Sequence, residues 1–361
     1  MKKIIVISLF ILSFLGCKKA SNDEPIIAEK LTIITPLEGQ LKAAGYVDIQ
    51  WNKLEGHGKI ISYNLYINDS LYTSTTNTYY EYYTTKVKYH KIRIEAVTQD
   101  EQIIKGNEIS FGISKKGLAT EDNFGALKYD PIAMNVSWYY NWGRGEFDTI
   151  NHHGYEKIEY VPMIWNATNS TEVNKKINDV INNKYKNLLT YNEPDLTEQA
   201  NMSVEQALSF WPNLQSHQYR LSSPATAYWP SISPTWFQPF MQEIANRNYQ
   251  LDFITIHAYP ENFEGKDLAN WFIENIIKPT YETYHKPIWI TEFSTIGNAV
   301  TKEGTAEFLE YVMPMLDELE YVERYSYFSY DAGNCNYGLI DFTTGELSPA
   351  GEVYKNLGNP K

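Results

Sequence analysis

From residue 131 to residue 358 the chain alternates between apolar runs and segments with helical periodicity. The runs are rich in β-branched and aromatic residues, as buried strands are. Strands that alternate with helices over such a length imply a parallel sheet with both faces covered. The seven clear runs are residues 132–138, 158–165, 187–193, 219–226, 251–259, 287–293 and 322–330.

Two of the segments between the runs carry helix start signals. Asn169 with Glu172, and Ser203 with Gln206, have the spacing of a capping box. An apolar face follows each box, which predicts an amphipathic helix packed on the sheet. The residues of these faces are Val173, Ile177, Val180 and Ile181 in the first segment and Ala207, Leu208 and Trp211 in the second.

The length of this region favours a (β/α)8 barrel, also called a TIM barrel, which belongs to the α/β class. Such a barrel needs eight strands, and seven runs are clear in the sequence. We expect the eighth strand between Trp142 and Lys157, where the sequence is polar and irregular.

A second region precedes the expected barrel, over residues 31–113. It consists of six or seven short runs of alternating polarity, separated by turn signals such as Asn68-Asp69-Ser70. This pattern predicts a small all-β sandwich of the immunoglobulin or fibronectin-III type. Residues 114–130 are expected to link the sandwich to the barrel, which then occupies residues 131–358.

The first 30 residues have the pattern of an exported protein. A charged start and an apolar stretch over residues 4–15 lead to a glycine and Cys17, which resembles the lipobox of bacterial lipoproteins. We therefore expect a signal peptide over residues 1–17, lipid on Cys17 and a polar tether over residues 18–30. An ordinary secreted protein is the alternative. Cys335 is the only other cysteine, so a lipidated Cys17 leaves no internal disulfide. The expected location is the bacterial cell envelope, on the periplasmic or surface face of the outer membrane.

The composition excludes several partners. The net charge of -13 argues against nucleic acid and against an anionic membrane face as partners, because both demand clustered Lys and Arg. Aromatic residues make up 15% of the chain, with 29 Tyr and 9 Trp. That content suits contact with flat apolar faces such as those of sugars, although location in β-strands accounts for many of the Tyr. A monomer is expected.

No metal or other cofactor is expected. The sequence has no Gly-rich phosphate cradle, no Cys/His cluster with metal-ligand spacing and no Gly-x-Ser-x-Gly elbow. His152 and His153 are adjacent, but they lie in a polar loop with no further ligand types at a suitable spacing.

Two glutamates stand at the ends of apolar runs, where the reactive groups of a (β/α)8 barrel lie. Glu193 and Glu292 each follow a run directly, so neither belongs to a solvated helix face. Two carboxylates that meet across the mouth of a barrel are the catalytic residues that glycoside hydrolysis requires. From the pattern alone, the alternative is a pair of glutamates that cap helix N-termini or pair with nearby lysines.

Six motifs follow one another in this region: TYNEPD (190–195), LSSPAT (221–226), FITIHAY (253–259), PIWITEF (287–293), VERYSYF (322–328) and GELSPAGEVYKNL (345–357). Together they resemble glycoside hydrolase family 128, which contains bacterial and fungal endo-β-1,3-glucanases, within the clan of retaining (β/α)8 glycosidases. The resemblance runs from about Trp138 to Leu357. It also implies that the missing strand precedes Asn192.

The resemblance implies a role for several residues of these motifs. Glu193 would be the general acid/base, protonated when substrate arrives, and Glu292 the ionised nucleophile. Tyr259 would donate a hydrogen bond to the nucleophile, and Asn192 would donate one to the sugar 2-hydroxyl. His257 shares the strand face of Tyr259 by period two and is an expected sugar contact, with a core histidine as the alternative.

Five aromatic residues near strand ends are candidates for stacking on sugar rings, although some of them must belong to the core. The family has a tryptophan near position 327, so Tyr327 departs from its pattern. The candidates are Trp138, Trp142, Trp165, Trp229 and Tyr327.

The resemblance therefore implies a retaining, endo-acting hydrolase of β-1,3-glucan that forms a covalent glycosyl-Glu292 intermediate and reaches the membrane only through its lipid. The β-region is expected to act as a spacer, and the stretch YYEYY (79–83) leaves carbohydrate binding open as a second role. Two alternatives remain: a glycosidase of the same clan for a mixed-linkage glucan or mannan, and a non-catalytic glycan-binding lipoprotein.

Overall fold

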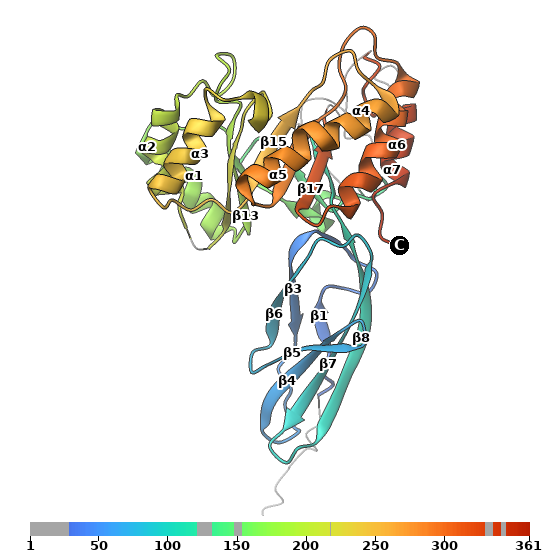
Figure 1. Cartoon of the computed structure of the whole chain (residues 1–361). Coiled ribbons are helices and arrows are strands. Elements are labelled where there is room, and N and C mark those ends of the chain that lie inside the picture. Colours follow the sequence, from blue (N-terminus) through green and yellow to red (C-terminus); the bar gives the residue numbers. More distant parts are fainter. Residues whose placement is uncertain (1–28, 121–131, 148–153, 217, 329–334, 341–343) are drawn as a thin grey trace, which may run out of the picture.

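The computed structural model contains an N-terminal region of strands and a C-terminal region of strands and helices (Figure 1). The predicted signal peptide and Cys17 lie outside the described residues, as do His152 and His153. Among the helices that the structure describes, none is both long and apolar enough to cross a membrane. The described residues are 29–120, 132–147, 154–216, 218–328, 335–340 and 344–361.

The N-terminal region consists of two sheets that share one core. One sheet has the strand order β1-β3-β6 and the other the order β2-β8-β7-β4-β5. Alternating burial explains the packing: in β7, Ile92 and Ile94 face the core, while the residues between them are partly exposed. The strands are β1 (Ile33–Thr35), β2 (Leu41–Ala43), β3 (Gly45–Trp51), β4 (Ile60–Ile67), β5 (Ser70–Thr75), β6 (Tyr79–Thr84), β7 (Tyr89–Thr98) and β8 (Ile103–Ser114).

The C-terminal region is a mixed α/β fold around parallel strands, which we call the strand ring. Parallel pairings lead from β9 to β10 and β11, and from β12 through β13, β14, β15, β16 and β17 back to β9. Because the pairings are parallel, the carboxyl ends of the strands meet at one edge. The strands are β9 (Lys116–Ala119), β10 (Trp138–Tyr140), β11 (Glu159–Tyr160), β12 (Met163–Ile164), β13 (Asn187–Asn192), β14 (Arg220–Ala225), β15 (Ile254–Ala258), β16 (Ile288–Phe293) and β17 (Val322–Tyr327).

Helices pack on the outer face of the strand ring and share its largest core (Figure 1). The side chain of Asn169 accepts a hydrogen bond from the backbone of Glu172, and Ser203 with Gln206 makes both bonds of the predicted capping box. The predicted apolar faces are buried, except that Ile181 is only partly so. The helices are α1 (Ser170–Asn182), α2 (Val204–Leu214), α3 (Phe237–Asn246), α4 (Gly265–Phe272), α5 (Lys278–Tyr284), α6 (Lys302–Glu318) and α7 (Pro349–Asn356), with short helical turns at η2 (Tyr155–Lys157), η3 (Pro230–Ile232) and η4 (Ile273–Ile277).

Strand β9 corrects the expected position of the eighth strand. It lies at Lys116–Ala119 and pairs with both β10 and β17. Between Trp142 and Lys157, the described residues form turns and the η2 helix but no strand. The prediction that residues 114–130 form a linker is therefore wrong for their first part, whereas residues 121–130 lie outside the described residues.

The two lysines before and in β9 explain why its sequence resembles a linker. The ammonium group of Lys115 donates to the carbonyl oxygens of Leu316, Asp317 and Leu319, at the C-terminal end of α6. That of Lys116 donates to the carbonyls of Tyr354, Lys355 and Leu357, at the end of α7. Ammonium groups suit helix C-termini, so Lys115 and Lys116 are buried at the start of a strand that the polarity pattern does not reveal.

Candidate active site

A cavity of about 880 Å³ opens at the carboxyl-end edge of the strand ring. This volume lies within the range of small-molecule and cofactor sites, roughly 300–1,000 Å³. Three carboxylates line it, those of Glu193, Glu261 and Glu292. Its aromatic lining comes from Trp142, Trp165, Tyr228, Trp229, Tyr259 and Phe328.

Glu292, near the end of β16, is held by three donors. Its Oε1 accepts hydrogen bonds from the Tyr140 hydroxyl and the Trp142 indole, each at 2.9 Å, and its Oε2 accepts one from the Tyr259 hydroxyl. Burial raises the pKa of Tyr140 and Tyr259 well above its usual value, and the charge of Glu292 raises it further, so both phenols stay protonated and donate. An ionised carboxylate only accepts hydrogen bonds, so this surrounding suits a charged Glu292.

Glu193 follows β13 directly and stands in strained backbone. Its φ is 43° and that of Tyr191 is 28°, both in the left-handed region that residues other than glycine seldom adopt. The Glu193 backbone N–H donates to the Ala225 carbonyl of β14 at 2.7 Å, which holds this conformation. Strain of this kind clusters at functional sites, and here it sets the carboxyl, 8% exposed, at the cavity wall.

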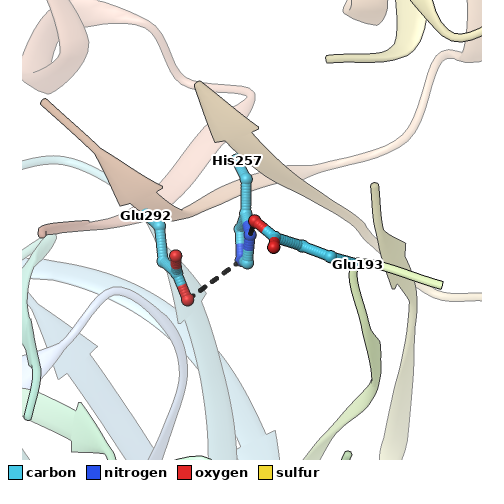
Figure 2. Close-up of side chains that lie close together, drawn as sticks. All are labelled: Glu193, His257 and Glu292. Carbon is cyan, nitrogen blue, oxygen red and sulfur yellow. Dashed lines mark hydrogen bonds and ion pairs between the residues drawn. The ribbon is translucent and has the colours of Figure 1, made fainter. Parts of the chain in front are cut away.

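His257 lies between the two glutamates (Figure 2). Its Nδ1 is 2.9 Å from Glu193 Oε1, and its Nε2 is 3.4 Å from Glu292 Oε1. The second contact is a charge contact only, because Nε2 makes no hydrogen bond within the described part of the chain. Burial lowers the pKa of His257, but the charge of Glu292 and the hydrogen bond and charge of Glu193 outweigh it, so the pKa is raised.

The same three side chains form the one group among the described residues that could hold a metal ion. One ligand atom from each of Glu193, His257 and Glu292 lies within 4.8 Å of the others. The hydrogen bonds to Glu292 from tyrosine and tryptophan occupy both of its oxygens, however, and a metal would have to compete with them. The donor set therefore fits a carboxylate pair used for proton and nucleophile chemistry better than a built metal site.

Most of the sequence-predicted site residues meet in this cavity. Asn192, Tyr259, Trp142, Trp165 and Trp229 line it together with the two glutamates. Tyr259 makes the predicted hydrogen bond to Glu292. Asn192 Nδ2 donates to Gln199 Oε1, while its buried Oδ1 has no partner among the described residues.

Trp138 and Tyr327 are the two predicted stacking residues that the structure contradicts. Both are fully buried. Trp138 packs on Trp289 inside the strand ring, and its indole donates to the Lys115 carbonyl at 3.0 Å. Tyr327 faces the helices, where its ring packs against Tyr354. Neither side chain has a surface left for a ligand.

Sequence reasoning missed three residues that the site uses. Tyr140 donates to Glu292, and Phe328 and Tyr228 line the cavity. A signal existed for the first two: Tyr140 shares the strand face of Trp142 by period two, and Phe328 lies in the apolar run of residues 322–330, directly after β17. Tyr228 stands in a loop and is 55% exposed, which no periodicity marks.

Asp195 connects the Glu193 segment to an aromatic loop of the cavity wall. Its Oδ1 accepts a hydrogen bond from the Ala227 backbone N–H at 2.9 Å, and Ala227 leads into Tyr228 and Trp229. Burial raises the pKa of Asp195, whereas the Ala227 hydrogen bond opposes that shift. The loop after β13 is thus bound to the loop after β14 beside the acidic pair.

A family model and several solved structures are similar to this chain. The model of the glycosyl hydrolase catalytic core matches residues 117–354. A GH128 subgroup I endo-β-1,3-glucanase from Amycolatopsis mediterranei, in complex with laminarihexaose, has 30% identity and a TM-score of 0.58, over 67% of this chain and 99% of its own. No curated protein sequence matches the chain.

Two further structures come from different subgroups of the same family. A subgroup II endo-β-1,3-glucanase from Sorangium cellulosum has 27% identity and a TM-score of 0.57, over 68% of this chain and 99% of its own. A subgroup III curdlan-specific exo-β-1,3-glucanase from Blastomyces gilchristii, in complex with glucose, has 30% identity and a TM-score of 0.52, over 67% of this chain and 98% of its own.

Proposed function

We propose that this chain, which belongs to the glycosyl hydrolase catalytic core family and has a family 128 catalytic domain, is a glycoside hydrolase. In this proposal it cleaves β-1,3-glucan with retention. The observation that carries the proposal is the pair Glu193 and Glu292 at the mouth of the strand ring. We take the ring to be the (β/α)8 barrel expected from the sequence, since its parallel pairings return to β9.

The spacing of the pair supports retention rather than inversion. Retaining glycosidases hold their carboxyl groups about 5–5.5 Å apart, whereas inverting enzymes leave about 6.5–9.5 Å for a water molecule. One oxygen of Glu193 and one of Glu292 lie within 4.8 Å of each other. This proximity is consistent with the retaining spacing and with direct attack by one carboxylate.

In the proposed first step, Glu292 attacks the anomeric carbon while Glu193 gives its proton to the leaving glycosidic oxygen. This forms a bond from Glu292 to the sugar and breaks the glycosidic bond. In the second step, Glu193 takes a proton from water, and the resulting hydroxide displaces Glu292 from the sugar. The product then has the configuration of the substrate.

The residues around the pair have distinct supporting roles. Tyr140, Trp142 and Tyr259 orient Glu292 and stabilise its charge before attack. His257 contacts Glu193 Oε1 through Nδ1, so it orients the carboxyl that moves the proton. Asn192 lines the cavity next to Glu193, so we propose it as a contact for a sugar hydroxyl.

The substrate and the mode of attack are proposed from the relatives and the cavity lining. The Amycolatopsis mediterranei enzyme carries laminarihexaose, and aromatic faces such as those of Trp165 and Phe328 suit sugar rings. We propose endo action because the subgroup I and II relatives are endo-β-1,3-glucanases. The subgroup III relative is exo-acting, so product analysis is the deciding measurement.

The activity is tested by incubating the purified chain with linear β-1,3-glucan, mixed-linkage β-glucan and β-mannan. We expect new reducing ends from the β-1,3-glucan, oligosaccharides of several lengths at early times, and β-configured first products by NMR. Glucose alone would indicate exo action, and faster hydrolysis of one of the other polymers would reassign the substrate. Binding of all three polymers without new reducing ends would make the chain a glycan-binding protein.

A second prediction concerns the loop that Asp195 holds. The Asp195→Ala variant is expected to raise KM for a β-1,3-gluco-oligosaccharide about tenfold with a smaller change in kcat, because a hydrogen bond to a charged group contributes roughly 1.5–3 kcal/mol and Tyr228 and Trp229 follow Ala227. Steady-state kinetics measure both constants. Asp195→Asn keeps an oxygen acceptor for the Ala227 N–H and is expected to stay near wild type, and equal KM values for wild type and Asp195→Ala would contradict the role.

We further propose that the chain is a lipid-anchored protein of the bacterial envelope. The support is the sequence pattern that ends at Cys17, followed by a polar tether. In this proposal, the region over residues 31–113 is the immunoglobulin-like or fibronectin-like sandwich between anchor and enzyme, and the chain works as a monomer. Metabolic labelling with a radioactive fatty acid, with Cys17→Ala as the control, tests the anchor.

A further inference from the structure

The N-terminal region lies against one side of the C-terminal region (Figure 1). Arg220 begins β14, and Glu323 and Arg324 are the second and third residues of β17, so all three lie where strands start. The cavity lies at the other edge, where Glu193 and Glu292 stand at or just beyond strand ends. We call the starting edge the floor of the ring.

A buried carboxylate joins the two regions at this floor. Glu323 is 0% exposed, and its two oxygens accept four hydrogen bonds. Arg220 donates two of them at 2.8 and 2.9 Å, and the Trp289 indole donates one at 2.6 Å. The fourth comes from the Tyr83 hydroxyl of β6 at 2.9 Å. A carboxylate has about four acceptor positions, so the N-terminal region fills the one that the ring leaves open.

Arg324 makes a second buried connection. Its Nε donates to the Ala44 carbonyl at 3.1 Å, and its Nη2 donates to Glu159 at 2.8 Å. Gly45, the next residue, has a φ of 109°, which only glycine adopts readily. The turn between β2 and β3 therefore approaches the floor with its backbone, and its Ala44 carbonyl is a hydrogen-bond partner of Arg324.

The covalent connection between the two regions is also short. Strand β8 ends at Ser114 and β9 begins at Lys116, with one residue between them. The Ser114 hydroxyl donates to the Gly358 carbonyl, and the Ser137 hydroxyl donates to the Ser114 carbonyl, each at 2.9 Å. The last residue of β8 is therefore bonded to the C-terminal region through both its hydroxyl and its carbonyl.

We propose that residues 29–114 are an integral part of the catalytic unit. They cover the floor of the strand ring, unfold together with the ring, and leave the cavity facing away from the N-terminal region. The argument rests on desolvated charges. Glu323 and Arg324 are buried under the N-terminal region, and a buried charge that loses a partner is strongly destabilising. Exposed pairs at the rim, such as Lys186 with Glu81, add little by comparison.

The test destabilises the core of the N-terminal region in the full chain and follows unfolding of the ring. Leu65 is buried in β4, and Leu65→Ala is expected to lower the unfolding midpoint of the N-terminal region by roughly 5 °C or more. Hydrogen exchange measured over a range of temperatures gives an unfolding midpoint for the peptide over residues 322–327. If the two regions are one unit, this midpoint falls by the same amount as that of the N-terminal region. An unchanged midpoint for that peptide, with the N-terminal region already open, overturns the proposal.

Milder and more local variants keep the result decisive if Leu65→Ala does not fold. Ile92→Val removes one methyl group from the same core and predicts a smaller joint shift of both midpoints. Tyr83→Phe removes only the hydroxyl that reaches Glu323 and is expected to speed exchange in residues 322–327, whereas Tyr79→Phe, at an exposed position of the same strand, is the control. Equal exchange in these two variants counts against the proposal. None of these readouts depends on catalysis, so they are independent of the proposed glucanase activity.

Discussion

The Glu292→Gln variant is expected to lose hydrolysis of β-1,3-glucan by a factor on the order of 10⁵ in kcat, because an amide cannot form the covalent intermediate. The donors around Glu292 sharpen this expectation. Tyr140, Trp142 and Tyr259 surround both of its oxygens, and a glutamine offers an NH₂ group in place of one acceptor. One donor then faces another, which disturbs the site further.

The measurement is the initial rate of reducing-end release, with the thermal midpoint as a check on folding. Glu261→Gln is the matched control, because Glu261 lines the same cavity and, within the described part of the chain, no hydrogen bond or ion pair joins its side chain to Glu193 or Glu292. We expect this control to keep most of the activity. A Glu292→Gln enzyme with more than a few per cent of the wild-type rate, free of wild-type contamination, would rule out Glu292 as the nucleophile.

The carboxylate pair could be predicted from the sequence because both glutamates end apolar runs. Parallel strands bring such ends to one edge, so the order of runs placed Glu193 and Glu292 at the same edge, and the family resemblance implied that they act as a pair. The contact of His257 with both carboxylates was not predictable, since period two gives the strand face but not the distance between neighbouring strands.

The depth of side chains in the ring was not predictable. Trp138, Tyr140 and Trp142 lie at alternate positions of one segment, yet the first is buried deep in the ring, the second reaches Glu292 and only the third lines the cavity. At β17 the face decided the outcome: Tyr327 faces the helices and Phe328 faces the cavity. A shift of one residue exchanges the two faces of a strand, and the sequence did not mark where the strand ends.

Strand β9 and the contacts at the floor could not be predicted from the sequence for another reason. The lysines of β9 are satisfied by carbonyls more than 200 positions away, and Tyr83 reaches Glu323 across 240 positions. Such partners satisfy buried charges only in the folded chain, so local polarity predicts exposed residues at positions that are in fact buried.

The last prediction separates the two glutamates. Glu193→Ala is expected to slow hydrolysis of β-1,3-glucan by about 10²–10⁴-fold, because the leaving sugar then departs without a proton. An aryl β-glucoside with an acidic phenol needs no such proton, so its first step is expected to slow by no more than about tenfold. The second step loses its base in either case, and the glycosyl-Glu292 intermediate accumulates as a burst of phenol.

Added azide should restore turnover of the aryl glucoside by Glu193→Ala but not by Glu292→Gln. The truncated side chain leaves room beside His257, and azide attacks the intermediate without a general base. A β-glucosyl azide, identified by NMR, then records two inversions at the anomeric carbon and therefore retention. An α-azide, or no burst of phenol from the aryl glucoside, would mean that the two carboxylates act on a water molecule instead, in spite of oxygens within 4.8 Å of each other.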